Sequence, residues 1–187
     1  MGAITGQIKV FDLEDSSLVI TIIHHFSAVN CLVLSGRFLF SASSDGSASI
    51  WEDFAHKEQV IAGNPVTSIA YEGENFVTGD DKGMVKLWDI ETRDILQEFK
   101  GHSKIVTVIA VSPDFIISGS IDRNICVWSI QKRVKRYFNA CADCIVDLSF
   151  AGHSHFLSGN QNGSIQKWNL MKRIHLISGF DPLINEL

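Results

Sequence analysis

Two segments of the chain carry a histidine, a serine and an aspartate at identical spacing: His25, Ser41, Asp45 and His102, Ser118, Asp122. These residue types form hydrolase triads, in which a histidine takes the proton of a nucleophilic serine. In each segment a tryptophan follows six residues after the aspartate, Trp51 and Trp128. A buried tryptophan N–H needs an acceptor, so the tryptophan can donate to the serine, the serine to a neutral histidine, and the histidine to the carboxylate. The pattern therefore allows either catalysis or a structural hydrogen-bond chain.

The same aromatic position recurs along the whole chain at Phe11, Trp51, Trp88, Trp128 and Trp168, with spacings of 40, 37, 40 and 40 by subtraction. Glycine stands five residues before four of these aromatics, at Gly6, Gly46, Gly83 and Gly163. A period of about 40 residues is typical of four-stranded propeller blades. Short alternating segments between turn residues support strands rather than helices. The sequence therefore predicts an all-β repeat protein.

On these residues the chain resembles the WD40-repeat family, and the resemblance covers nearly all of it. The resemblance implies two structural tetrads: His25, Ser41, Asp45, Trp51 and His102, Ser118, Asp122, Trp128. In this interpretation each serine is buried on a second strand and lacks the access and oxyanion hole that a nucleophile needs. The third unit has Ala62 and Lys82 at the histidine and aspartate positions, and the fifth has Ala142 and Asn162. We therefore expect no enzyme, and we expect the third and fifth units to be softer.

The expected fold is an all-β WD40 propeller or partial propeller within a single domain, residues 1–187. About four complete four-stranded blades are predicted, over residues 24–62, 63–100, 101–139 and 140–178, with half-blades at both termini, 1–23 and 179–187. The fourth strand is predicted at Gln59–Ala62 in the second blade, at Val134–Asn139 in the fourth blade and at Ile174–Ser178 in the fifth blade.

Most WD40 propellers have seven blades, so three arrangements stay open. The tail could close a five-bladed ring, the arc could self-associate with a second copy through its open edges, or the chain could be a truncated fragment of a longer WD40 protein. Exposed strand edges and apolar blade faces favour association. The acidic first half and basic second half would suit head-to-tail contact.

Composition and motifs argue against a membrane protein, a secreted protein and a protein that binds a metal or cofactor. The net charge is −5, and no apolar run reaches the length of a membrane helix. The four cysteines without a secretory signal predict a cytoplasmic or nuclear protein with reduced thiols. The Cys141–Cys144 pair is separated by a strand from His153 and His155, so no metal site is expected. No cofactor motif is present either.

Function is predicted to be scaffolding of protein–protein contact in a multiprotein complex. The family resemblance implies docking on the loops before first strands and between second and third strands, where the candidate contact residues are Phe26, Ser44, Asp81, Lys104, Ile121 and Arg123. The alternative is an RNA-associated or ribosome-assembly factor. The basic residues Lys132, Arg133, Lys135 and Arg136 beside aromatics could contact RNA, but they are expected on an outer strand, where such residues blunt an edge.

Overall fold

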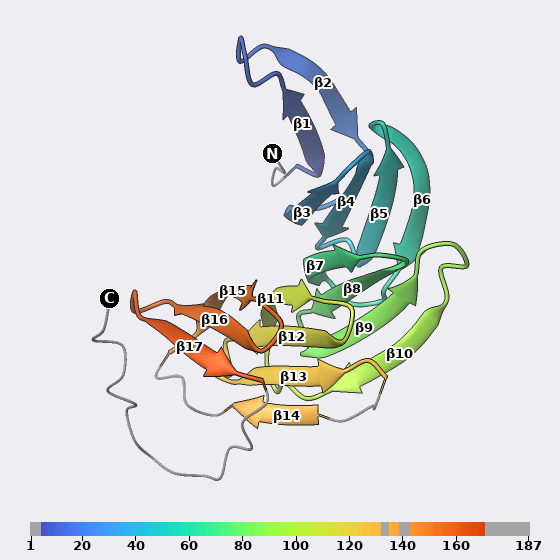
Figure 1. The fold of residues 1–187 in the computed structure, drawn as a ribbon. Helices are drawn as coiled ribbons and strands as arrows, with labels where there is room; N and C mark the ends of the chain where they lie inside the picture. Colours follow the sequence, from blue (N-terminus) through green and yellow to red (C-terminus); the bar gives the residue numbers. More distant parts are fainter. Residues whose placement is uncertain (1–4, 132–134, 139–142, 171–187) are drawn as a thin grey trace.

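In the computed structural model, the chain forms an open arc of five antiparallel sheets (Figure 1). The structure describes residues 5–131, 135–138 and 143–170. The strands are β1 Gln7–Phe11, β2 Leu18–Ile23, β3 Val29–Ser35, β4 Phe38–Ser43, β5 Ser47–Glu52, β6 Ala55–Ile61, β7 Val66–Glu72, β8 Asn75–Asp80, β9 Met84–Asp89, β10 Ile95–Lys100, β11 Val106–Val111, β12 Phe115–Ser120, β13 Ile125–Ser129, β14 Lys135–Phe138, β15 Ile145–Ala151, β16 His155–Asn160 and β17 Ile165–Asn169. The all-β prediction is confirmed.

Each sheet pairs strands in chain order, because each strand is joined to the next by a short turn. The order is β1-β2 in the first sheet, β3-β4-β5-β6 in the second, β7-β8-β9-β10 in the third, β11-β12-β13-β14 in the fourth and β15-β16-β17 in the fifth. These sheets are numbered here as blades one to five. The first strands line the concave side of the arc and the fourth strands its outer rim (Figure 1). The predicted strand at 174–178 and the terminal pieces at 1–3 and 179–187 lie outside the described residues.

Apolar side chains fill the junctions between blades. Phe40 and Ile50 of the second blade pack with Val66, Phe76 and Trp88 of the third. Similar clusters lie between the third and fourth blades and between the fourth and fifth. The second, third and fourth blades therefore bury both faces against their neighbours, which explains their strongly apolar strands. The described part of the chain contains no helix that could cross a membrane.

One strand boundary differs substantially from the prediction. The second blade's fourth strand was expected at Gln59–Ala62, whereas β6 runs over Ala55–Ile61. The reason is a tight hairpin at Asp53 and Phe54, which both have positive φ (48° and 62°) and bring Glu52 opposite Ala55. Such left-handed conformations are uncommon in residues other than glycine, and no glycine marks this turn in the sequence.

Candidate functional site

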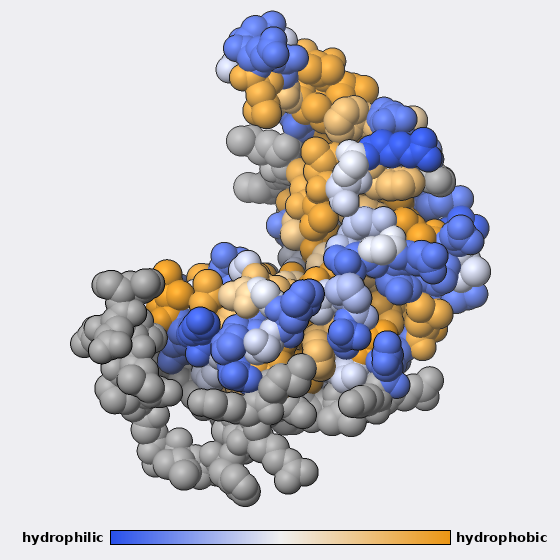
Figure 2. Space-filling model, viewed as in Figure 1, coloured by the Kyte–Doolittle hydropathy of each residue, from blue (hydrophilic) through white to orange (hydrophobic). Residues whose placement is uncertain are grey.

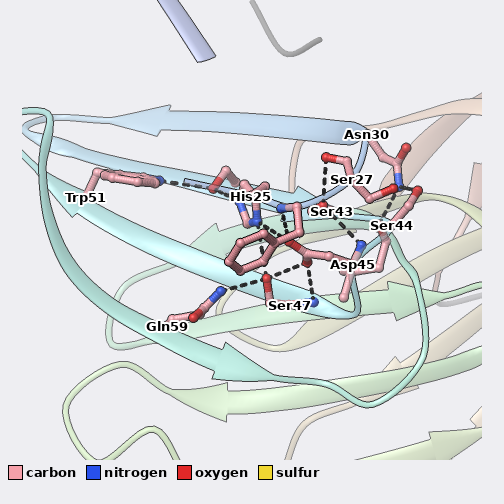
Figure 3. A network of polar contacts seen from close by, with 12 residues as sticks. His25, Ser27, Asn30, Ser43, Ser44, Asp45, Ser47, Trp51 and Gln59 are labelled. Carbon is pink, nitrogen blue, oxygen red and sulfur yellow. Dashed lines mark hydrogen bonds and ion pairs between the residues drawn. The ribbon is translucent and has the colours of Figure 1, made fainter. Parts of the chain in front are cut away.

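The second blade holds a continuous polar chain from its edge to its loops (Figure 3). Trp51 Nε1 donates to Ser41 Oγ at 3.0 Å, and Ser41 Oγ lies 2.7 Å from His25 Nε2. His25 Nδ1 lies 3.1 Å from Asp45 Oδ2. The chain joins the loop before the first strand, the second strand, the turn and the third strand. Because every member is at least partly buried, water offers little competition for these bonds.

Asp45 is the acceptor that ends this chain. Its carboxylate also accepts from the Ser47 hydroxyl at 2.6 Å and from the backbone N–H groups of Ser47 and Phe26, each at 2.9 Å. Burial raises the pKa of Asp45, but the hydrogen bonds from Ser47, Phe26 and His25 outweigh it and lower the pKa to about 2. Gln59 Nε2 extends the network by donating to Ser47 Oγ (Figure 3).

The fourth blade repeats the arrangement. Trp128 Nε1 donates to Ser118 Oγ at 3.1 Å, and Ser118 Oγ lies 2.9 Å from His102 Nε2. His102 Nδ1 lies 3.1 Å from Asp122 Oδ2, which also accepts from the backbone N–H of Ser103. Burial raises the pKa of Asp122. The hydrogen bonds from the backbone and the nearby His102 act in the opposite direction, and the pKa is lowered overall. The two sequence-predicted sets are thus each brought together.

The hydrogen bonds of the two tetrads hold segments of each blade together, and they do not present either serine to a substrate. Ser41 and Ser118 have no exposed surface, and each hydroxyl accepts a hydrogen bond from a tryptophan. A nucleophilic serine has to reach a substrate carbonyl beside an oxyanion hole. Within residues 5–131, 135–138 and 143–170, no group of histidine, cysteine, aspartate or glutamate is arranged to hold a metal ion.

The third blade keeps the tryptophan–hydroxyl bond but replaces the histidine–aspartate pair. Trp88 Nε1 donates to Thr78 Oγ1 at 2.8 Å. Asp80 accepts from the Asn64 side chain at 2.8 Å, and the partly buried Lys86 donates to the Ala62 carbonyl at 2.7 Å. The comparison of tetrad positions in the sequence did not predict these bonds, because Asn64, Asp80 and Lys86 stand near the tetrad positions of the repeat and not at them.

A second missed feature ties neighbouring blades together. The register of each first strand shifts after Val29, Val66 and Val106, which leaves Asn30, Thr67 and Thr107 as bulged residues. Their side chains donate to a carbonyl of the next blade's first strand: Asn30 to Val66 at 2.7 Å, Thr67 to Val106 at 2.5 Å and Thr107 to Ile145 at 2.5 Å. A bulge re-aims a side chain in this way. The matching residue in the fifth blade is Val146, which has no side-chain donor.

The predicted contact loops of successive blades lie on one face of the arc, here called the loop face. In the second to fifth blades the loop before the first strand is hydrogen-bonded to the loop between the second and third strands; examples are Ser44 N–H to Ala28, Asp81 N–H to Pro65 and Ile121 N–H to Ile105. Of the candidate contact residues, Phe26 has 94% of its surface exposed, and Lys104 and Arg123 are also exposed. Ser44, Asp81 and Ile121 are half-buried. Ser44 accepts from Asn30, and Asp81 pairs with Lys82.

His24 lies beside the second blade's tetrad in a cluster of rings. Its ring centroid is 4.2 Å from that of His56 and 5.0 Å from that of Trp51. His24 Nε2 is buried and has no hydrogen-bond partner among the described residues. Burial, followed by the charges of His56 and His25, lowers the pKa of His24, while Asp45 acts in the opposite direction.

These shifts predict that acid weakens the second blade in two steps. Because the folded pKa of His24 is lowered, the unfolded chain binds this proton first, and stability falls as the pH drops below about 6.5. Asp45 contributes roughly 2 kcal/mol that is fully present above pH ~4 and is lost as the pH falls toward about 2. Urea unfolding at a series of pH values measures both steps. Asp45→Asn should reduce the lower step and leave the part that comes from Asp122, whose pKa is also lowered; an unchanged pH dependence in that variant would contradict the assignment.

Comparison with known proteins agrees with the geometry. The sequence profile described as "WD domain, G-beta repeat" matches residues 16–52, 56–89 and 93–129, more than half of the chain. The arc is similar to the solved structure of U3-55K, with a TM-score of 0.84 at 22% identity over 91% of this chain and 57% of that one. It is also similar to the computationally designed Ika4 protein, with a TM-score of 0.72 at 26% identity over 79% of this chain and 94% of that one.

Curated relatives are longer proteins. The chain is 26% identical over 145 residues to the U3 snoRNP-associated protein-like EMB2271 of Arabidopsis thaliana, covering 74% of this chain and 30% of the relative. It is 23% identical over 171 residues to the WD repeat-containing protein 55 homolog of Dictyostelium discoideum, covering 86% of this chain and 42% of the relative. The chain thus spans less than half the length of either protein.

Proposed function

Because the chain belongs to the WD40-repeat family, we propose that it is a non-catalytic scaffold that docks other proteins on its loop face. The observation that carries this proposal is the display of Phe26. Its side chain is 94% exposed, whereas its backbone N–H is held by the Asp45 carboxylate at 2.9 Å. The tetrad of the second blade thereby holds the backbone of a residue whose apolar side chain is exposed on the loop face.

Such an arrangement favours binding for two reasons. An exposed aromatic side chain contributes large apolar area to an interface, and aromatic anchors carry much of the binding energy in protein complexes. A fixed backbone reduces the conformational entropy that association would otherwise cost. The tetrads, in this account, stabilise the blades and place the loops, and the loops supply the contacts.

The test is affinity purification of partners with two matched variants. Phe26→Ser removes the anchor from the loop face, and Leu13→Ser removes a side chain that is 98% exposed in the β1–β2 turn. These positions lie at opposite ends of β2, so the pair compares the two ends of one strand. We expect Phe26→Ser to lower recovery of captured proteins about tenfold, which corresponds to about 1.4 kcal/mol of binding energy.

Both substitutions affect exposed side chains, so both variants should fold like the wild type by circular dichroism. Retained capture by Phe26→Ser together with lost capture by Leu13→Ser would instead place the docking surface at the β1–β2 turn. Equal capture by all three proteins would refute the proposal.

A second candidate is an assembly factor of RNA–protein particles, which places the scaffold in the nucleus rather than the cytoplasm. The similarity to a relative named as U3 snoRNP-associated supports it. Of the predicted RNA-contacting residues, Lys132 and Arg133 lie outside the described part of the chain. Ribonuclease treatment before purification separates the candidates: loss of the captured proteins favours particle assembly, and their retention favours direct protein contact.

Self-association is a further proposal, supported by the two ends of the arc. Val19 (59% exposed) and Ile23 (74%) lie on the first blade, and Val146 (52%) and Ile165 (70%) on the fifth. Hydrophobic residues also gather along the N-terminal arm and the concave side in Figure 2. Exposed apolar faces of this kind promote association. Light scattering over a concentration series measures whether the chain is monomeric.

A further inference from the structure

One turn of the loop face departs from the rule that the other turns follow. Four units place a glycine with positive φ five residues before the closing aromatic: Gly6 (77°), Gly46 (87°), Gly83 (85°) and Gly163 (84°). The fourth unit has Arg123 at this position, with φ of 68°. The turn therefore keeps its left-handed conformation although its residue carries a long side chain.

This conformation is unfavourable for arginine. A Cβ atom in the left-handed region crowds the backbone, which is why glycine is the usual residue there. Strained backbone of this kind occurs preferentially at binding sites, where the side chain is retained for its contacts. The Arg123 side chain makes no compensating ion pair with any residue in the described part of the chain. It is exposed on the loop face.

Lys104 lies on the loop joined to the Arg123 turn, and Lys82 lies on the turn that packs against the Lys104 loop from the third blade. Ser120 Oγ donates to the Lys104 carbonyl at 3.3 Å, and Ile121 N–H donates to the Ile105 carbonyl, so the two loops of the fourth blade are joined. On the other side, a Cβ built on Gly83 would stand only 2.8 Å from the Lys104 carbonyl oxygen. The turn that contains Lys82 thus packs against the loop that contains Lys104. Lys82, Lys104 and Arg123 form a row across two blades, here called the basic row.

The carboxylates beside the basic row keep their charges but are less exposed than its three cations. Asp122 is engaged by His102 and by the backbone N–H groups of Ser103 and Asn124. Asp81 lies 3.5 Å from Lys82, whose side chain is nevertheless 70% exposed. Lys104 takes part in none of the ion pairs among the described residues. Lys104 and Arg123 therefore present exposed charges that pair with no carboxylate in the described part of the chain.

We propose that the basic row binds an acidic segment of a partner protein, with Arg123 as the central contact. Arginine binds carboxylates through two parallel hydrogen bonds, and flanking lysines add charge. This inference rests on the proposed docking role of the loop face and names the chemistry of one partner. A nucleic acid fits less well, because single strands are held by stacking on aromatic rings and Phe26 lies in the second blade, away from the row.

The test measures binding of a fluorescein-labelled Gly/Ser peptide rich in glutamate by anisotropy at low salt. The same peptide with glutamine in place of glutamate is the control ligand. Arg123→Gly restores the residue type of the other four turns, so we expect the melting temperature to stay the same or rise while binding weakens about tenfold. Arg123→Lys should keep part of the binding, because the charge remains without the bidentate geometry.

Arg93→Gly is the matched control variant. Arg93 also has positive φ (65°), but it lies in the β9–β10 turn at the opposite end of the third blade and pairs with Glu58. It should bind the peptide like the wild type. Equal binding by wild type and Arg123→Gly, equal binding of the glutamine peptide, or a preference for labelled oligouridylate that depends on Arg123 would each overturn the proposal. If Phe26→Ser still abolished partner capture, the docking role of the loop face would stand without it.

Discussion

Replacing His102 with alanine should destabilise the protein by about 3 kcal/mol. The substitution removes the ring that joins Ser118 and Asp122, and it leaves the fully buried Ser118 and the half-buried Asp122 without that partner. Loss of a buried hydrogen-bond partner costs about 1–3 kcal/mol, and the space left by the ring adds to this cost. Urea unfolding followed by tryptophan fluorescence measures the change, because Trp128 belongs to the same network.

His153→Ala is the control for this experiment. His153 is exposed in the turn between β15 and β16, so its loss should change the free energy of unfolding by less than about 0.5 kcal/mol. A His102→Ala protein as stable as the His153→Ala protein would show that the hydrogen-bond chain does not hold the fourth blade together.

Gly83→Ala should have a comparable effect for a different reason. Gly83 has φ of 85°, and a Cβ atom there would stand 2.5 Å from the carbonyl oxygen of His102. The contact is with backbone, so it can be relieved only by separating the turn of the third blade from the loop of the fourth. We expect a loss of about 3 kcal/mol, combining backbone strain with a steric clash.

The comparison with Gly163→Ala isolates the clash. Gly163 has nearly the same φ, 84°, but apart from its chain neighbours no atom of residues 5–131, 135–138 and 143–170 lies within 4 Å of the position of an added Cβ. Its replacement should cost only about 1 kcal/mol, from backbone strain alone. Thermal denaturation of the two variants measures the difference. Equal losses of stability would mean that the loop contact between the third and fourth blades does not stabilise the fold.

The repeat explains how much of this fold can be predicted from the sequence. The aromatic period sets the blades, and the turn glycines mark where second strands end. The tetrad members follow from hydrogen-bond chemistry, because a buried tryptophan needs an acceptor and a buried histidine needs two partners. Their positions repeat in the second and fourth blades, so the unit from His102 to Trp128 predicts the contacts of the unit from His25 to Trp51.

Features that depend on packing between units could not be predicted in this way. The bonds from Thr67 and Thr107 to the next blade require a bulge, and a bulge has no distinct sequence mark here. Lys86 reaches the Ala62 carbonyl from a position that is serine in one blade and cysteine in another. The hairpin after Trp51 turns at two residues other than glycine. Each outcome depends on neighbours that the period does not specify.

The candidate contact residues illustrate the same limit. Loop positions follow from the repeat, but exposure does not: Phe26 is almost fully exposed, whereas Ile121 is half-buried against its own blade. The left-handed conformation of Arg123 could not be predicted either, although the sequence shows that Arg123 stands where the other four units have glycine. Loop chemistry varies independently of the fold, so partners have to be inferred from the surface.

Cross-linking of the captured complex tests the docking surface most directly. A lysine-reactive cross-linker followed by mass spectrometry compares Lys82 and Lys104 on the loop face with Lys9 and Lys100, which are exposed on strands of the first and third blades. The account predicts that links to partner proteins fall mainly on Lys82 and Lys104. Links concentrated on Lys9 and Lys100, with the loop-face lysines unlinked, would contradict docking on the loop face.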